Sequence, residues 1–309
     1  MKSCLIIDDM HPSIIPLLEE VGWRVDYRPD IIRNEVLEII HHYEGLIVRS
    51  KTEVDQEMIG RASQLRWIAR AGAGLDQLNL KALEERNIRV VNAPEGNRDA
   101  LAEHAIALLL ALFNKIHTAD REIRSGIWKR EANRGTELMG KTIGIIGYGY
   151  MGQAFARRLQ GFGVEVLAYD KYRHHYTDSY ARQADMEEIF ETTDVLSLHV
   201  PLTEETRFML NEDYLNRFSK NIFLLNTARG KNISLKTLVS YLENGKLLGA
   251  ALDVLENEKL ATLTEEQKHW FERLVQMENV IITPHVGGWT HESYEKINQV
   301  LVNKIKGLY

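Results

Sequence analysis

Three polar side chains that could support acid–base chemistry each follow an apolar, strand-like stretch in the second half of the chain. Arg229 follows NIFLLNTA, Glu258 lies just beyond GAALDVLEN, and His285 follows NVIITP. A histidine can exchange a proton with a hydroxyl group near neutral pH. A carboxylate on its other ring nitrogen would fix the tautomer and favour the protonated ring. An arginine fork can hold a substrate carboxylate with two hydrogen bonds.

Each of these side chains also has an ordinary structural interpretation. Arg229 could be a surface cation, Glu258 a solvated acid in ENEKL, and His285 a half-buried hydrogen-bonded residue. They carry more weight together, because the carboxyl ends of neighbouring parallel strands meet at one rim of a sheet. If the three preceding strands are neighbours, the sequence predicts one catalytic set of Arg229, Glu258 and His285.

A glycine-rich turn predicts where a cofactor would bind. Gly147, Gly149 and Gly152 form G-x-G-x-x-G between the strand-like TIGII and the helical MGQAFARRLQGF, and the next strand-like stretch, VEVLAY, ends at Asp170. The first glycine permits a tight turn, the second lets backbone approach a pyrophosphate, and the third lets helix pack on strand. Asp170 could accept hydrogen bonds from ribose hydroxyls and repel a 2′-phosphate, which favours NAD over NADP. Lys171 and Arg173 could weaken that repulsion, and the alternative for the whole motif is an ordinary βα turn.

Short apolar runs alternate with helical patterns almost throughout, which is typical of an α/β fold with a parallel sheet. Ten runs predict strands: CLII, GLIVR, LRWIAR, IRVVN, TIGIIG, VEVLAY, DVLSLHV, NIFLLN, LLGAALDV and NVIIT. A long apolar helix is expected at about 99–117, an irregular polar segment at 120–140, and a last helix at about 290–306 that returns to the first units. We therefore expect two domains, the first discontinuous: residues 1–97 with 286–309, and residues 98–285.

The composition limits the partners and the compartment. Lys and Arg number 38 against 44 Asp and Glu, so the net charge of −6 argues against a nucleic-acid or anionic-membrane surface. The single cysteine, Cys4, excludes an intramolecular disulfide and fits a reducing compartment. The start of the chain does not read as a signal peptide, and the run AIALLLALF is too short for a membrane helix. We expect a soluble, cytoplasmic protein with no membrane partner and no metal.

The motifs together resemble the D-isomer-specific 2-hydroxyacid dehydrogenase family. The matching stretches are VRSKTEVD, IARAGAGLDQLNL, VVNAPEGN, GIWKR, GKTIGIIGYGYMG, LHVPLTEET, LLNTARG, ALDVLENE and TPHVGGWT. The resemblance implies a Rossmann-type NAD domain at 98–285, a flavodoxin-like substrate domain formed by the remainder, and a homodimer, for which the apolar helix at 99–117 is a second indication. It also implies that Arg229, Glu258 and His285 are the catalytic triad and that Asp253 lies near the nicotinamide carboxamide. The residues expected to bind the cofactor are Gly147, Gly149, Tyr150, Met151, Gly152, Asp170, His199, Val200, Pro201, Thr206, Thr227, Ala228, Asp253, His285 and Gly287.

Two positions depart from the family pattern. Lys259 stands where proline usually follows the catalytic glutamate, which would loosen the loop and leaves Glu256 as an alternative for the role. Ser234 stands where the family usually has aspartate after the arginine motif, a change we interpret as neutral for chemistry.

Additional cations bear on the substrate. Arg49 ends GLIVR, Arg70 ends LRWIAR just before AGAG, and Arg130 lies in GIWKR. Arginine forks and backbone amides suit a phosphate dianion, and the phosphoglycerate dehydrogenase branch of the family resembles this chain at Arg49 and Arg70. Alone, those two arginines would be interpreted as salt-bridge residues. The predicted substrate-binding residues are Arg49, Ser50, Arg70, Ala71, Gly72, Ala73, Arg130 and Arg229.

The predicted reaction is the NAD-dependent oxidation of D-3-phosphoglycerate to 3-phosphohydroxypyruvate, which begins serine synthesis. The resemblance is to the short form of the phosphoglycerate dehydrogenase branch, so we expect no regulatory domain after Tyr309. The main alternative is reduction of hydroxypyruvate, glyoxylate or another 2-ketoacid. A minor alternative is an NAD(H)-sensing corepressor-like protein, against which an intact set of Arg229, Glu258 and His285 argues.

Overall fold

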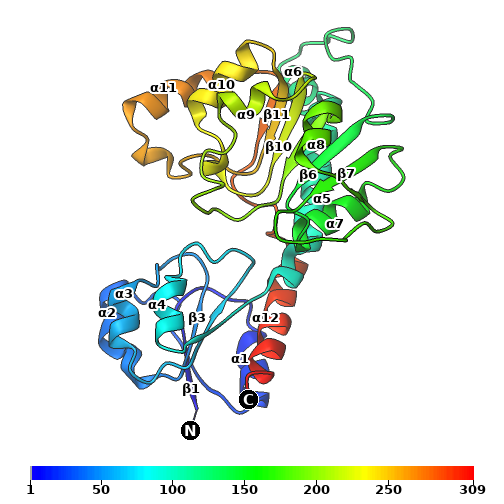
Figure 1. The fold of residues 1–309 in the computed structure, drawn as a ribbon. Coiled ribbons are helices and arrows are strands. Elements are labelled where there is room, and N and C mark those ends of the chain that lie inside the picture. The colour runs from blue at the N-terminus through cyan, green and yellow to red at the C-terminus, as the bar shows by residue number, and fades with distance from the viewer. Residues whose placement is uncertain (1) are drawn as a thin grey trace. The chain divides into compact units, whose positions relative to one another are not determined.

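Two parallel β-sheets, each with helices on both faces, make up the fold in the computed structural model, which describes residues 2–309 (Figure 1). The chain divides into two compact units: residues up to Asp99 with Trp289–Tyr309, and Ala100–Gly288. Helix α5 (Pro94–Phe113) carries the chain from the first unit into the second. The α/β class predicted from the alternating pattern is confirmed.

The first unit contains a five-stranded sheet in the order β2-β1-β3-β4-β5, which is the flavodoxin-like order. Its strands are β1 (Ser3–Ile6), β2 (Arg24–Tyr27), β3 (Gly45–Val48), β4 (Trp67–Arg70) and β5 (Arg89–Asn92). Its helices are α1 (Ile14–Glu20), α2 (Arg33–Ile39), η1 (Ile40–His42), α3 (Gln56–Arg61), α4 (Leu80–Glu85) and α12 (His291–Lys306). Alternate strand residues face opposite sides, so Cys4 and Ile6 pack under α1 and α12, whereas Leu5 packs under α2, α3 and α4.

The second unit contains a seven-stranded sheet in the order β12-β11-β10-β9-β6-β7-β8, the Rossmann order extended by one strand. Its strands are β6 (Thr142–Ile146), β7 (Glu165–Tyr169), β8 (Arg182–Gln183), β9 (Val195–Leu198), β10 (Ile222–Asn226), β11 (Leu247–Leu252) and β12 (Val280–Ile282). Its further helices are α6 (Ile116–Arg124), α7 (Tyr150–Arg158), α8 (Met186–Thr192), α9 (Glu212–Asn216), η2 (Gly230–Asn232), α10 (Leu235–Glu243), η3 (Leu260–Thr262) and α11 (Glu265–Leu274). Helices α5 and α7 cover one face of this sheet, and α8 to α11 cover the other.

All ten strands predicted from apolar runs are present, and two further strands were missed. Both missed strands, β2 and β8, lie at the edge of their sheets, and neither has a wholly buried residue. An edge strand is covered on fewer sides, so its sequence need not be apolar, and RVDY and RQ carry no such signal.

The helix expected at 99–117 differs from the prediction at both ends. It begins at Pro94, because proline suits the first helical turn, and it ends at Phe113. Lys115 then adopts a φ of +50°, and α6 begins at Ile116, so the segment expected to be irregular starts with a helix. Among the described residues, no single helix is both long enough and apolar enough to cross a membrane. Helices α5 and α6, which are bent by 65° at the break between them, reach the necessary length and apolar composition only when taken together.

Candidate active site

The glycine-rich turn joins β6 to α7 and leaves space beside the start of that helix. Gly147 has a φ of +94°, and a Cβ there would meet the carbonyl oxygen of His199 at 2.5 Å. A Cβ on Gly152 would collide with the carbonyl oxygen of Gly147. A Cβ on Gly149, in contrast, would meet nothing within 4 Å. Packing therefore requires glycine at positions 147 and 152, whereas Gly149 borders an open cradle where the first amides of α7 can bind an anion.

Asp170 follows β7, the strand next to β6, and its carboxylate is tied to the glycine-rich turn. It accepts the backbone N–H of Tyr148 at 2.8 Å and two backbone amides of its own loop at 3.0 and 3.1 Å. Lys171 is paired with Glu205 at 2.6 Å, and Arg173 donates to the carbonyl oxygen of Tyr148. The two cations that could offset repulsion between Asp170 and a 2′-phosphate are thus engaged with other groups.

Arg229 lies just beyond β10 in a turn that two buried asparagines hold. Asn226 donates to the carbonyl oxygen of Arg229 at 3.0 Å, and Asn232 accepts the backbone N–H of Arg229 at 3.2 Å. A Cβ on Gly230 would overlap the carbonyl oxygen of Leu255, so only glycine fits there. The backbone that carries the guanidinium is therefore fixed from several sides.

The segment carrying His285 is attached to Asp253, which follows β11. The Asp253 carboxylate accepts the backbone N–H groups of Val286 at 2.9 Å and Gly287 at 2.8 Å. The backbone carbonyl oxygen of Asp253 accepts the backbone N–H of His285 at 2.8 Å. His285 has a φ of +56°, a left-handed conformation that few residues other than glycine adopt. The surrounding hydrogen bonds hold this unusual conformation in place.

The structure brings the imidazole of His285 against the carboxylate of Glu258. Nδ1 of His285 lies 2.9 and 3.0 Å from the two carboxylate oxygens. This hydrogen bond raises the pKa of His285, while burial and nearby Arg229 act in the opposite direction. Because Nδ1 faces Glu258, the nitrogen that could exchange a proton with a ligand is Nε2.

Glu256, the alternative partner for His285, is engaged elsewhere. It accepts the backbone N–H of Leu235 at 2.7 Å, at the start of α10, and the side-chain amide of Gln267 at 3.0 Å. The structure therefore places Glu258, and not Glu256, against His285.

The two departures from the family pattern have structural explanations. The loop with Lys259 in place of proline is held by Asn257, which accepts the Lys259 backbone N–H at 3.0 Å and donates to Thr262. Ser234 is the N-cap of α10 and accepts the backbone N–H of Thr237 at 3.0 Å, a role that aspartate would also fill.

In the first unit, Arg49 follows β3 and stacks on an aromatic side chain from the C-terminal segment. Its guanidinium carbon lies 3.4 Å from the ring centroid of Trp289 and 5.3 Å from that of Tyr294. Burial lowers the pKa of this guanidinium, and its backbone N–H donates to buried Asp8 at 2.7 Å. Stacking covers a face of the guanidinium and leaves its in-plane donors suited to an anion.

Arg70 ends β4, the strand beside β3, and its side chain folds over the following turn. It donates to the carbonyl oxygen of Ala71 at 3.3 Å, and a Cβ on Gly72, whose φ is +138°, would overlap the guanidinium. Ala73 accepts a hydrogen bond from Asn92 at 2.7 Å, and Ser50 is exposed next to Arg49.

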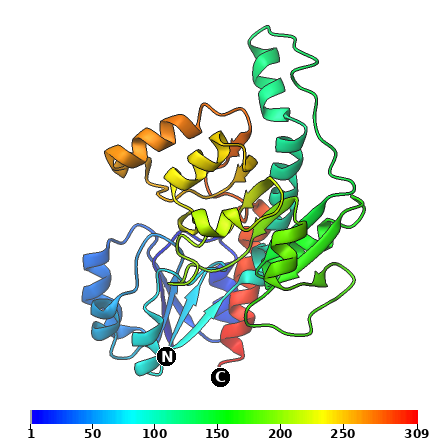
Figure 2. The same cartoon turned by 45° about the horizontal axis from the view of Figure 1, so that its top comes forward.

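The remaining predicted residues lie in the second unit. Tyr150 and Met151 begin α7, and the others follow the ends of β9 and β10: His199, Val200, Pro201, Thr206, Thr227 and Ala228. Burial lowers the pKa of His199 to about 3, so its ring, 2.8 Å from Ser197, is neutral. Arg130 is exposed in the segment after α6, which lies apart from the sheet of its unit (Figure 2).

The sequence did not predict several side chains that contact Arg49, Arg229 and Asp253. His104, Asn226, Asn232 and Trp289 each touch a predicted residue or its backbone. A signal was present in two cases, because His104 is a polar residue within the apolar run LAEHAIALLL and Trp289 is a large aromatic beside two glycines.

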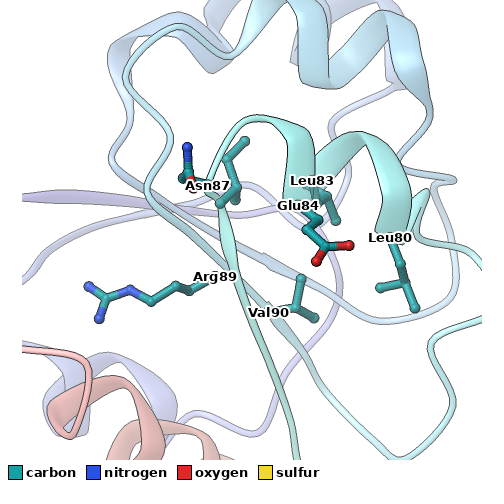
Figure 3. A pocket seen from close by; sticks show the side chains of 7 residues that line it. Leu80, Leu83, Glu84, Asn87, Arg89 and Val90 are labelled. Atoms are coloured by element: carbon teal, nitrogen blue, oxygen red, sulfur yellow. The ribbon is translucent and has the colours of Figure 1, made fainter.

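A pocket of about 430 Å³ lies in the first unit between α4 and β5 (Figure 3). It is lined by Leu80, Leu83, Glu84, Asn87, Ile88, Arg89 and Val90. It contains none of the predicted site residues, and its two opposite charges give it no clear selectivity for an ion.

The second sheet, its glycine cradle and the acid at the end of β7 define a dinucleotide-binding α/β protein. The open space at Gly149 is where a pyrophosphate would fit, and Asp170 is held beside the same turn.

Comparison with known proteins assigns the family. A family model described as D-isomer specific 2-hydroxyacid dehydrogenase, NAD binding domain, matches residues 106–287. Hydroxypyruvate reductase of Thermotoga maritima is 37% identical over 88% of this chain and 87% of its own length. D-3-phosphoglycerate dehydrogenase of Methanocaldococcus jannaschii is 35% identical over 99% of this chain, which spans 57% of that protein. A solved D-lactate dehydrogenase from Aquifex aeolicus, complexed with NAD and lactic acid, has a TM-score of 0.84 at 25% identity and covers 99% of this chain and 95% of its own.

The chain therefore belongs to the D-isomer specific 2-hydroxyacid dehydrogenase family of NAD-dependent oxidoreductases, and NAD is its cofactor. The predicted family and cofactor are confirmed.

Replacing Glu258 should lower the pKa of His285. In Glu258→Gln the imidazolium loses a charged acceptor, so the ring should deprotonate at lower pH than in the wild type. An NMR titration of the His285 ring, assigned with His285→Ala, measures this directly. Glu256→Gln is the matched control and should leave the titration unchanged, because Glu256 bonds to Leu235 and Gln267. An unchanged pKa in Glu258→Gln would contradict the pairing.

Substituting the glycines should separate cofactor binding from folding. Gly149→Ala puts a methyl group into the open cradle, so the Kd for NADH should rise about tenfold or more while Tm stays near that of the wild type. Gly152→Ala should lower Tm as well, because its Cβ collides with Gly147. Fluorescence titration with NADH and thermal unfolding provide the two readouts. Wild-type NADH affinity in Gly149→Ala would show that the cradle is not the binding site.

Proposed function

We propose that this protein oxidises a D-2-hydroxy acid with NAD, and that its substrate is D-3-phosphoglycerate. The observation that carries the reaction is the His285–Glu258 hydrogen bond at the ends of β12 and β11, with Arg229 beyond neighbouring β10. We assign cofactor binding and the reacting groups Arg229 and His285 to the second unit, and we take Arg49 and Arg70 of the first unit as the candidate phosphate ligands.

The residues divide the chemistry between them. NAD, when bound, supplies the hydride acceptor for oxidation and, as NADH, the hydride donor for reduction. As the C–H hydride leaves the hydroxy acid, Nε2 of His285 takes the hydroxyl proton, and in reduction it returns that proton to the carbonyl oxygen. Glu258 holds Nδ1 and stabilises the imidazolium that forms. The Arg229 fork binds the substrate carboxylate beside the reacting carbon.

The phosphorylated substrate is supported by cations and by relatives. Arg49 is partly desolvated on Trp289, and Arg70 overlies the AGAG turn, whose amides suit an anion. Several relatives that match nearly the whole chain are D-3-phosphoglycerate dehydrogenases. We further propose a place in serine synthesis, a homodimer, and a reducing cytoplasm in which the buried thiol of Cys4 stays free.

A second candidate is reduction of hydroxypyruvate or glyoxylate. The relative that is 37% identical is a hydroxypyruvate reductase, and another at 35% is a glyoxylate reductase. These substrates carry a carboxylate and no phosphate, so they need Arg229 but gain less from additional cations.

The substrate can be assigned by comparing two reactions in one variant. Arg70→Ala should lower kcat/KM for D-3-phosphoglycerate about 10- to 100-fold, as expected when a charge-assisted hydrogen bond is lost. It should lower kcat/KM for hydroxypyruvate much less. Arg66→Ala is the matched control, because Arg66 is an exposed partner of Glu44 in the same unit. If Arg70→Ala leaves 3-phosphoglycerate oxidation unchanged, Arg70 is not a phosphate ligand.

The proton-transfer role can be tested at His285. His285→Ala should lower kcat about 10²- to 10⁴-fold while the Kd for NADH changes only a few-fold, because the imidazole contributes more to proton transfer than to cofactor binding. Stopped-flow turnover and NADH fluorescence give the two values. Near-normal kcat across the pH range would remove His285 from the mechanism.

A further inference from the structure

One polar side chain of α5 reaches the segment that carries His285. Nε2 of His104 lies 3.0 Å from Oγ1 of Thr283 and 3.3 Å from Oδ1 of Asp253. The His104 side chain is 22% exposed and that of Asp253 only 2% exposed, so the contact lies within the packed interior of the second unit.

The three groups fit only one arrangement of hydrogens. The Thr283 hydroxyl lies 2.6 Å from Oδ1 of Asp253 and 3.5 Å from the carbonyl oxygen of Leu252. An ionised carboxylate can only accept and is the much closer acceptor, so the hydroxyl donates its single proton to Asp253. The Thr283 oxygen must then accept from His104. Nε2 of His104 therefore carries a proton, which Thr283 and Asp253 share.

The same carboxylate organises the catalytic segment. Burial pushes the pKa of Asp253 upward, but the hydrogen bonds from His104, Thr283 and the amides of Gly287 and Val286 outweigh it, so its pKa lies below the ordinary value. The ionised Asp253 carboxylate, which these donors hold in one orientation, keeps the amides of Val286 and Gly287 bound. The backbone carbonyl oxygen of Asp253 binds the amide of His285.

Packing adds a second constraint on the same contact. A Cβ at Gly287 would meet Oδ2 of Asp253 at 2.8 Å and Cδ2 of His104 at 3.2 Å. The segment therefore lies directly on both side chains, and a change at His104 reaches it through the carboxylate and through direct contact.

We infer that His104 is a positioning residue for proton transfer: its Nε2–H orients the Asp253 carboxylate, which holds the amides of Val286 and Gly287 so that the preceding His285 keeps its left-handed backbone and faces Glu258. The inference rests on the proposed role of His285. Without this donor, the buried carboxylate can turn, its amide bonds weaken, and the strained conformation of His285 relaxes.

The pH dependence of catalysis reports this positioning. The groups that face His285 are Glu258 and Asp253, which raise its pKa, and Arg229, which lowers it. If the segment relaxes, the contact with Glu258 lengthens and the pKa of His285 falls. The kcat/KM for ketoacid reduction, which needs the protonated imidazole, should then decline at lower pH than in the wild type.

Two amide substitutions separate donor position from packing. The side-chain nitrogen of His104→Gln can reach the position of Nε2, whereas that of His104→Asn is too short. With NADH and hydroxypyruvate, we expect His104→Asn to lower kcat about 10- to 100-fold, the size of loss found when a residue that orients a metal ligand is replaced. NADH affinity should fall far less than kcat, and Tm should drop by only a few degrees, because the other donors to Asp253 remain. His104→Gln should restore kcat to within a few-fold of the wild type, with its pH profile.

Parallel measurement of His285→Ala distinguishes the two ways of failing. If His285→Ala loses activity but His104→Asn keeps wild-type kcat and pH profile, the positioning inference alone is overturned. Equal losses in His104→Gln and His104→Asn, with an unshifted pH profile, would also overturn it, because packing alone would then explain them. If His285→Ala retains activity, the proposed mechanism itself fails. Should His104→Asn unfold, the His104→Gln profile decides: a wild-type profile supports the inference, and a shifted one overturns it.

Discussion

A buried, ionised carboxylate is the constraint on which the candidate active site depends. Asp253 is 1% exposed, and a charge in that position is tolerated only when hydrogen-bond donors surround it. The donors come from different parts of the second unit: the imidazole of His104 on α5, the hydroxyl of Thr283 after β12, and the amides of Val286 and Gly287. Satisfying this one charge fixes the course of the chain through His285, including a backbone conformation that the histidine would not adopt alone.

The sheet supplies the rest of the geometry. Strands β10, β11 and β12 are parallel neighbours, so Arg229, Glu258 and His285 follow strand ends on one rim of the same sheet. Asn226 and Asn232 fix the backbone of Arg229, while Glu256 turns away to the start of α10 and leaves Glu258 to meet the imidazole. A proton acceptor, its orienting carboxylate and a guanidinium are thereby held on a rigid framework, as hydride transfer between a hydroxy acid and NAD requires.

Much of this arrangement could be predicted from the sequence, because apolar runs record burial on both faces of a parallel sheet and G-x-G-x-x-G records a specific turn. The edge strands β2 and β8 could not be predicted, since a strand covered on fewer sides need not be apolar. His104 escaped notice for a different reason. Its importance comes from partners far away in sequence, such as Thr283 at a separation of 179 residues, and no local pattern records such a distance. The same holds for Trp289, whose stacking on Arg49 depends on the return of α12 to the first unit.

The most direct measurement is a crystal structure of the protein with NAD and D-3-phosphoglycerate or a non-reacting analogue. Nε2 of His285 should lie within hydrogen-bond reach, about 2.6–3.2 Å, of the oxygen on the reacting carbon. Nδ1 should remain on Glu258, and the Arg229 fork should hold the substrate carboxylate. An imidazole turned away from that oxygen, or an oxygen bound by some other proton donor, would contradict the assignment of His285 as the acid–base group.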